Sequence, residues 1–376
     1  MRIASVVGTR PQLIKAAALQ PALRARHDEI FIDTGQHWDA AMAGAFFAEL
    51  GLARPDYSLG AGGGSQASQT AAMLLRLEPV LLEQEPDLVM VYGDTNSTLA
   101  GTLTAAKLGL PVAHVEAGLR SFDRRMPEEL NRIVTDHLST WLLAPTPAAV
   151  EHLGAEGITR GVTLVGDLML DLAARISLEV RDAVVLRRIA HDLGHHAGRD
   201  VDLLPGAYLF ATIHRAENRD PAALKAAMTL LDRAARPTRP VVLALHPGTR
   251  VALERAGIAV GPNVVVVEPQ SYRTSLALQL HAAAVLTDSG GVQRESAWLG
   301  VPCLVLRSTT EWTETIDASA GATRLVGTDA ALVAAALDEL APVESSAALA
   351  VGRAAALNLR PAGAAAAIVA AINQVP

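Results

Sequence analysis

The sequence has few cysteines, few aromatic residues and no long apolar runs, and these absences exclude several classes of protein. Among its 376 residues is a single cysteine, Cys303, so no internal disulfide can form, and we expect a reducing compartment, the cytoplasm. No apolar run is long enough to span a membrane, and the first residues read as a strand rather than as a signal peptide. Aromatic residues make up only 3% of the chain, which predicts a core of Ala, Val, Leu and Ile.

The chain also lacks a basic excess. Its formal net charge is −7 and its pI is about 5.9, so the composition does not indicate a basic surface for binding nucleic acid. Half of the residues are apolar and 19% are charged, a composition typical of globular proteins. Because 376 residues exceed one ordinary hydrophobic core, we expect two domains.

Short apolar runs alternate with longer helical patterns. The runs are nearly continuous, as in strands buried on both faces of a parallel sheet. One set lies at residues 2–7, 29–34, 88–94, 111–118, 141–146 and 162–167, and a second at 208–214, 240–247, 263–269, 285–289, 302–307 and 323–327. The helical patterns between them, such as residues 69–87, make the chain an α/β protein.

This pattern predicts two domains and a C-terminal helix. Residues 1–168 and 169–355 each supply enough strands for one doubly wound parallel sheet of about six strands. Residues 356–376 contain an alanine-rich helix. Two such domains facing each other would leave a cleft bordered by the carboxyl ends of both sheets, where ligands of α/β proteins usually bind.

Polar and glycine-bearing turns follow most of the predicted strands. Since the carboxyl ends of parallel strands share one edge of a sheet, these turns predict a polar cleft. They are Gly8-Thr9-Arg10, Gly35-Gln36-His37, Gly93-Asp94, Glu116-Ala117-Gly118, His214-Arg215, His246-Pro247 and Ser289-Gly290-Gly291.

The segment "DSGGVQRES" joins a strand to a helix. Ser289 can cap the helix, while Gly290 and Gly291 let backbone N–H groups approach an anion closely. The helix N terminus then favours a diphosphate, and Glu295 is placed to accept hydrogen bonds from vicinal hydroxyls such as those of a ribose. A tight strand-to-helix turn with Glu295 as a solvated charge explains the same residues.

The segment "GTRPQLIKAA" closes the first strand. Pro11 fits the first position of a helix, and Gly8 permits a sharp turn. Arg10 and Lys15 then lie near a helix N terminus as a cationic pair able to meet phosphate oxygens. The alternative is that both are ordinary surface charges.

Two carboxylates, Asp94 and Glu116, end adjacent strands. A carboxylate there is costly to desolvate unless it is paired, and the partners available nearby are Arg120, Arg124 and Arg125.

The next helix begins at Pro127. Its apolar face consists of Leu130, Ile133, Val134 and Leu138, and a separate polar stripe consists of Glu128, Arg132 and Asp136. The stripe is either a solvated face with ion pairs or, joined with Asp94 and Glu116, part of an acid/base site.

Histidines follow two strands of the second set. His214 or His246 can hold a phosphate when charged or carry a proton near neutral pH. A metal site is not expected, because the adjacent His195 and His196 cannot easily face one ion and no cysteine cluster exists.

Together these motifs resemble a known family. In order along almost the whole chain they are "GTRPQLIK", "TGQH", "GDTNST", "HVEAGLRS", "PEELNR", "TIHRAEN", "TDSGGVQRES" and "LRSTTEW". The series is similar to the non-hydrolysing UDP-N-acetylglucosamine 2-epimerases. The resemblance implies a GT-B architecture, two Rossmann-like doubly wound parallel-sheet domains with an interdomain cleft, and a C-terminal helix that packs back on the first domain.

The resemblance also implies a reaction, interconversion of UDP-GlcNAc and UDP-ManNAc. UDP leaves carbon 1 while carbon 2 loses its hydrogen, and UDP is then added back to the 2-acetamidoglucal. The implied catalytic residues are Asp94, Glu116, Glu128 and His214, with base and acid unassigned among the carboxylates. The implied substrate-binding residues are Arg10, Lys15, Arg132, His246, Ser289, Gly290, Gly291, Glu295 and Arg307. No cofactor or metal is implied, and a homodimer is expected.

The chain departs from the family pattern at several places. Many members carry Gln-Glu-Glu where this chain has Gln293-Arg294-Glu295, and Glu-Arg-Pro-Glu at residues 311–314, where it has "EWTE". The usual Gly-Asp-Gly near the C terminus appears only as "RPAGAA", and Trp38-Asp39 puts activation by a second UDP-GlcNAc in doubt.

Three alternatives remain open at this stage. The segments "SFDRRMPEE" and "TEWTE" resemble the branch acting on UDP-2,3-diacetamido-2,3-dideoxy-glucuronic acid, whose carboxylate Arg124 and Arg125 would be able to meet. A GT-B glycosyltransferase, the second alternative, would share the fold and the UDP-binding residues. A regulator that binds a UDP-sugar without turnover is the third, although every catalytic position is filled.

Overall fold

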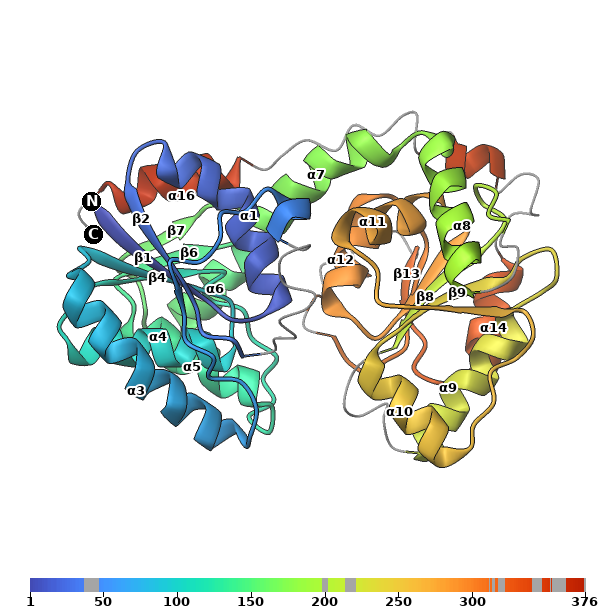
Figure 1. Cartoon of the computed structure of the whole chain (residues 1–376), viewed down its shortest axis with the longest axis horizontal. Helices are drawn as coiled ribbons and strands as arrows, with labels where there is room; N and C mark the ends of the chain where they lie inside the picture. Colours follow the sequence, from blue (N-terminus) through green and yellow to red (C-terminus); the bar gives the residue numbers. More distant parts are fainter. Residues whose placement is uncertain are drawn as a thin grey trace. The chain divides into compact units, whose positions relative to one another are not determined.

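The computed structural model describes residues 1–36, 47–197, 202–213, 221–310, 312, 315–316, 322–339, 347–351, 353 and 363–374. Its contacts divide the chain into two compact units. The first consists of Met1–Leu172 with Arg360–Pro376, and the second of Ala173–Leu359. Each unit is a parallel sheet with interleaved helices (Figure 1), which confirms the predicted α/β class.

The first unit contains a seven-stranded parallel sheet of order β3-β2-β1-β4-β5-β6-β7. The direction of winding reverses between β1 and β4, the place where α/β sheets bind ligands. Only the two-residue β3 has no counterpart among the predicted strands, because it is too short to show a pattern. The strands are β1 (Arg2–Val7), β2 (Asp28–Asp33), β3 (Tyr57–Ser58), β4 (Leu88–Tyr92), β5 (Val112–Val115), β6 (Trp141–Ala144) and β7 (Val162–Leu164).

Helices cover both faces of this sheet (Figure 1). One face carries α1 (Arg10–Arg24) and α16 (Ala364–Ile372), and the other carries α3 (Gln66–Gln84), α4 (Asn96–Lys107) and α5 (Pro127–Leu138). The helix α6 (Pro147–Ala155) joins β6 to β7. Because both faces are covered, the central strands bury nearly all of their aliphatic side chains, among them Val6, Ile32, Val89 and Val91.

The C-terminal helix α16 is held at both of its ends by the first unit. The Asp171 carboxylate accepts hydrogen bonds from the backbone N–H groups of Gly363 (3.0 Å) and Ala365 (3.2 Å), which caps the helix. The Trp141 indole donates to the carbonyl of Gln374 at 3.1 Å. Along its length α16 lies beside α1 (Figure 1).

The second unit contains a six-stranded parallel sheet of order β10-β9-β8-β11-β12-β13, which reverses between β8 and β11. Its strands are β8 (Leu209–Ile213), β9 (Val241–Leu245), β10 (Val264–Val267), β11 (Ala284–Thr287), β12 (Cys303–Val305) and β13 (Thr323–Leu325). Its helices are α8 (Ala183–Ala197), α9 (Pro221–Ala234), α10 (Pro247–Ala256), α11 (Tyr272–His281), α12 (Gly290–Trp298) and α14 (Ala330–Asp338), while α7 (Leu168–Val180) runs from the first unit into the second.

The helix α5 buries the opposite face from the one that its apolar residues suggest. Leu130, Val134 and Leu138 are 50%, 37% and 40% exposed, whereas the polar residues Arg132 and Asp136 are buried. The polar face turns inward because the carboxyl ends of β4 and β5 offer it charged partners. The interpretation of the polar stripe as a solvated face is therefore wrong for Arg132 and Asp136, while its third member, Glu128, is exposed.

Candidate active site

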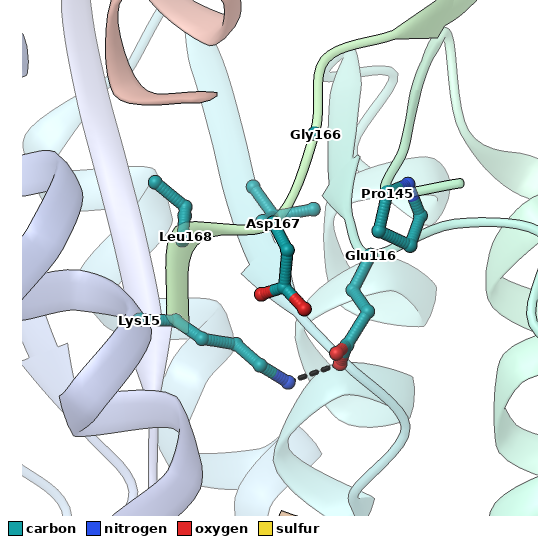
Figure 2. A pocket seen from close by; sticks show the side chains of 7 residues that line it. Lys15, Glu116, Pro145, Gly166, Asp167 and Leu168 are labelled. Carbon is teal, nitrogen blue, oxygen red and sulfur yellow. Dashed lines mark hydrogen bonds and ion pairs between the residues drawn. The ribbon is translucent and has the colours of Figure 1, made fainter. Parts of the chain in front are cut away.

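An ion pair between Lys15 and Glu116 lies at the carboxyl edge of the first sheet (Figure 2). Lys15 projects from the second turn of α1, and Glu116 follows directly after β5. Their side chains are only 7% and 9% exposed. Two charges so far removed from water are stable only as a pair, so each fixes the position of the other.

The turn that leads into α1 is fixed by Gln12. Its side-chain oxygen accepts hydrogen bonds from the backbone N–H groups of Gly8 (2.8 Å) and Thr9 (3.1 Å), and its amide donates to the Tyr92 carbonyl at 2.7 Å. A Cβ at Gly8 would lie 2.0 Å from the hydroxyl of Thr34, so only glycine fits there. The ends of β1 and β4 are thereby joined beside Lys15.

Asp94 lies two residues beyond β4 and pairs with Arg132 of α5. The distance from Asp94 Oδ2 to Arg132 Nη2 is 2.6 Å, and Asn131 donates to the Asp94 carbonyl at 3.0 Å. Desolvation by the surrounding protein raises the pKa of Asp94; the carboxylates of Glu116 and Glu128 add to this effect, and Arg132 and Lys15 oppose it. Asp94 therefore keeps a proton to higher pH than an ordinary aspartate does.

Glu128 completes the predicted group of carboxylates. It lies in the first turn of α5, is exposed, and is near enough to Asp94 to raise the pKa of that residue. The structure thus brings Asp94, Glu116 and Glu128 together at one sheet edge, with Lys15 and Arg132 as counter-charges. Such a group can exchange protons with a bound molecule.

The backbone at Glu116 is strained. Its φ of +73° lies in the left-handed region that non-glycine residues seldom adopt, and Gly118 follows with φ +83°. The N–H groups of Glu116 and Ala117 both donate to the carbonyl of Leu143, at 3.1 and 3.3 Å. Strain of this kind, held by surrounding bonds, is common where a side chain must point into a functional site.

Asp167 is a residue of this site that the sequence analysis missed. It lines the same small pocket as Lys15, Glu116 and Leu168 (Figure 2). One carboxylate oxygen accepts from the Met169 N–H at 2.8 Å, so Asp167 also caps the start of α7. The signal was present, because "VTLVGD" ends in Gly-Asp after a strand, just as "LVMVYGD" does.

The segment "DSGGVQRES" begins the helix α12 of the second unit, as predicted. Ser289 is the N-cap residue, and its hydroxyl accepts from the Val292 N–H at 3.4 Å. Gly290 and Gly291 form the first turn, where backbone N–H groups have no partner within the helix. The arrangement suits an anion such as a diphosphate.

Glu295 points into the unit rather than into solvent. It is 4% exposed, and one of its oxygens accepts a hydrogen bond from the Gln279 amide at 2.6 Å. The interpretation as a solvated charge is therefore wrong. The Gln279 contact holds the carboxylate in one orientation.

The other predicted ligands of the second unit follow strands of the same edge. His246 ends β9, and its Nδ1 accepts from the Gly248 N–H at 3.1 Å as the cap of α10. Arg307 lies two residues beyond β12 and is half-buried. Arg10, in the first unit, is exposed at the start of α1. His214 and His37 lie outside the described residues.

Two of the departures from the family pattern are in contact with each other. The Arg294 guanidinium lies 3.7 Å from the centre of the Trp312 ring, and both side chains are 5% exposed. The neighbouring Gln293 amide donates to the Trp312 carbonyl at 3.3 Å. A buried cation–π contact thus joins the two unusual residues.

Within the ranges that the structure describes, no three His, Cys, Asp or Glu side chains gather closely enough to hold a metal ion. Nor is any helix of those ranges long and apolar enough to cross a membrane.

Two doubly wound parallel-sheet units place this protein among the GT-B-type α/β proteins, as the sequence predicts. The chain belongs to the UDP-N-acetylglucosamine 2-epimerase family, whose model matches residues 21–372.

Several relatives resemble the chain over most of its length. A UDP-2,3-diacetamido-2,3-dideoxy-D-glucuronate 2-epimerase of Pseudomonas aeruginosa is 42% identical, over 87% of this chain and 88% of its own. A UDP-N-acetylglucosamine 2-epimerase of Methanocaldococcus jannaschii is 38% identical, over 87% and 88%. The crystal structure of a UDP-GlcNAc 2-epimerase from M. jannaschii, in complex with UDP-GlcNAc and UDP, covers 99% of each chain with a TM-score of 0.82 and 33% identity.

Proposed function

We propose that the protein is a UDP-N-acetylglucosamine 2-epimerase, which interconverts UDP-GlcNAc and UDP-ManNAc. The observation that carries the proposal is the group of Asp94, Glu116 and Glu128 at the edge of the first sheet, in a chain that belongs to this family over nearly its whole length. An isomerase of this kind needs groups that remove a proton from one face of carbon 2 and return one to the other face.

The carboxylates act in an elimination and re-addition. The C2–H bond breaks and its proton passes to a carboxylate base, while the C1–O bond breaks and its electron pair leaves with UDP. The products are 2-acetamidoglucal, with a double bond between carbons 1 and 2, and UDP. Re-addition of UDP to carbon 1, with protonation of carbon 2 on the opposite face by a carboxylic acid, gives the epimer. Desolvation raises the pKa of Asp94, which favours the protonated form of this residue more than that of an ordinary aspartate and makes it the stronger candidate for the acid.

The leaving UDP is the second requirement. Departure of a diphosphate is easier when N–H groups and cations already surround it. In our proposal the N terminus of α12 binds the diphosphate and Glu295 binds the ribose hydroxyls. The full set of proposed UDP and sugar ligands is Arg10, Lys15, Arg132, His214, His246, Ser289, Gly290, Gly291, Glu295 and Arg307.

The test is to incubate the protein with UDP-GlcNAc in heavy water and to follow carbon 2 by proton NMR. We expect deuterium to enter carbon 2 while the UDP-ManNAc signals grow, and no free N-acetylmannosamine to form. UDP-GlcNAc that stays fully protonated in the presence of active, folded protein would contradict the proposal.

A second candidate function is 2-epimerisation of UDP-2,3-diacetamido-2,3-dideoxy-D-glucuronate. The specific observation is the 42% identity to the P. aeruginosa enzyme of that name. Against it, Arg124 and Arg125, the arginines expected to meet the substrate carboxylate, are both exposed, and Arg125 is paired with Asp123 through hydrogen bonds of 2.9 and 2.8 Å. The same heavy-water experiment, run with each UDP-sugar in turn, decides between the two functions. The natural substrate is the one with the higher kcat/KM for deuterium incorporation.

We also infer that the protein forms a homodimer through the helices on one face of the first sheet. The helices α5 and α3 lie on that face (Figure 1), and each carries exposed apolar side chains: Leu130, Val134 and Leu138 on α5, and Leu75 and Leu82 on α3. Large apolar side chains in a row on a helix are typical of an interface.

Light scattering during size exclusion tests the dimer. We expect twice the 39.3 kDa chain mass for the wild type and a shift towards one chain mass for Val134→Glu. Leu332→Glu, at an equally apolar and 53% exposed site on α14, should leave the mass unchanged. A wild type of one chain mass would contradict the inference.

A further inference from the structure

His114 is a fully buried histidine whose two ring nitrogens both have partners. It lies in the middle of β5 and is 0% exposed. Its Nε2 is 2.7 Å from the carbonyl oxygen of Gly93, and its Nδ1 is 2.7 Å from Asp136 Oδ1. Because a carbonyl oxygen can only accept, Nε2 carries a hydrogen.

The other contacts of Asp136 indicate whether the proton in its hydrogen bond with His114 belongs to the imidazole or to the carboxyl group. Asp136 Oδ2 accepts from the Gly118 N–H at 3.1 Å and from Arg120 Nη1 at 2.7 Å. Burial raises the pKa of Asp136, but the charges of His114 and Arg120 and their hydrogen bonds outweigh it and lower that pKa below its usual value. Independently of His114, a backbone N–H and the Arg120 guanidinium both donate to Oδ2, which favours the carboxylate form of Asp136, and Nδ1 of His114 then donates to Oδ1.

Arg120 is shared between two carboxylates. It forms two further hydrogen bonds with Glu156, of 2.6 and 2.8 Å, and Glu156 is partly exposed, with a side chain that is 29% accessible. The titratable and charged groups of the cluster are Arg120 after β5, Asp136 and His137 on α5, and Glu156 after α6, with His137 Nδ1 3.9 Å from Glu156 Oε2. The fully buried Asp136 therefore has two positive partners when the His114 ring is an imidazolium, one on each oxygen.

We propose that His114 is held as a buried imidazolium that positions the two turns carrying Asp94 and Glu116. Its Nε2–H holds the carbonyl of Gly93, the residue before Asp94. Through Asp136 it holds the N–H of Gly118, two residues after Glu116. His114 touches no substrate in this account. It is a positioning residue, and this role rests on the proposed function of the two carboxylates.

The protonation state is tested on the wild-type protein without substrate, by NMR of the full chain with ¹⁵N-labelled histidine. We expect His114 to show two protonated ring nitrogens in the folded protein, because both of its ring nitrogens face acceptors. His281 is the internal reference, since it is also buried and its burial lowers its pKa, so it should show one protonated nitrogen in neutral solution. The His114 signal is assigned by its loss in His114→Gln or, if that variant does not fold, by correlating the ring signals with the assigned backbone of the wild type.

A His114 ring with one bare nitrogen in the folded wild type would overturn the proposal. Because no turnover is involved, this outcome is separate from any failure of the proposed function.

The positioning role is tested by the kinetics of His114→Gln. A glutamine amide can donate to the Gly93 carbonyl or to the Asp136 carboxylate, but it carries no charge. We expect kcat for deuterium exchange to fall by about 100-fold, the loss typical of a catalytic group displaced by roughly 1 Å, with KM changed less than about threefold. His281→Gln, which removes a buried histidine bonded to the Val180 carbonyl, should lower stability without lowering kcat.

Equal falls in kcat for the two variants, or an unchanged kcat in folded His114→Gln, would contradict a positioning role.

Discussion

Glu116→Gln should slow deuterium entry at carbon 2 of UDP-GlcNAc by about 10²- to 10⁴-fold, the usual contribution of a positioned acid or base. The amide has the shape of the carboxylate but cannot take a proton, and it leaves the charge of Lys15 unbalanced in a site where both side chains are less than one-tenth exposed. Single-turnover exchange in heavy water measures the loss without interference from product release.

The control for this variant is Glu151→Gln on α6, an exposed glutamate of the same unit. It should exchange at the wild-type rate. If folded Glu116→Gln exchanged within about threefold of the wild type, Glu116 would not be one of the proton-transferring groups, and the account of the site would need a different base.

Gly118→Ala should destabilise the first unit by about 3 kcal/mol or more. Gly118 has φ +83°, and a Cβ there would lie 2.3 Å from the carbonyl oxygen of Ala149 and 2.9 Å from the Leu153 side chain. A backbone carbonyl inside α6 cannot move aside as a flexible side chain can, so the turn or the helix must shift. Chemical denaturation followed by circular dichroism measures the change in the free energy of unfolding.

The matched control is Gly154→Ala in α6, the helix that Gly118 touches. A Cβ at Gly154 meets nothing within 4 Å, so this change should stabilise the helix by about 0.5–1 kcal/mol through the better helix propensity of alanine. If Gly118→Ala were as stable as the wild type, the close approach of the turn to α6 would be in error.

The sheets were predictable from sequence because their strands are buried on both faces. Runs such as "RIASVV" and "LVMVYGD" are apolar nearly throughout, and each corresponds to a central strand. The strand β3 carries no such signal in two residues. The buried face of α5 was not predictable from hydrophobicity. Its polar side chains can be buried only because they pair with residues of other segments, as Arg132 does with Asp94.

The candidate site was predictable in its members but not in its pairings. Parallel strands end at a common edge, which is why Asp94 and Glu116 were expected to lie together. The expected partners were Arg120, Arg124 and Arg125. Arg120 instead pairs with Asp136 and Glu156, Arg125 pairs with its neighbour Asp123, and Arg124 is exposed. The partner of Glu116 is Lys15, which is distant in sequence, so the pairing depends on the fold.

The rival reactions differ in what happens to UDP. A glycosyltransferase of the same fold would release UDP only when an acceptor takes the sugar, and a regulator would bind UDP-GlcNAc and leave it intact. An epimerase that works by elimination separates UDP from the sugar and rejoins them in every cycle. The fate of the bond between carbon 1 and the β-phosphate therefore distinguishes all three.

The measurement that tests the central claim most directly is positional isotope exchange with UDP-GlcNAc carrying ¹⁸O in the bridge between carbon 1 and the β-phosphorus. If UDP leaves and returns, its β-phosphate can rotate, and ³¹P NMR will show the label moving into non-bridging positions while deuterium enters carbon 2. Deuterium that enters carbon 2 while every ¹⁸O stays in the bridge would contradict elimination.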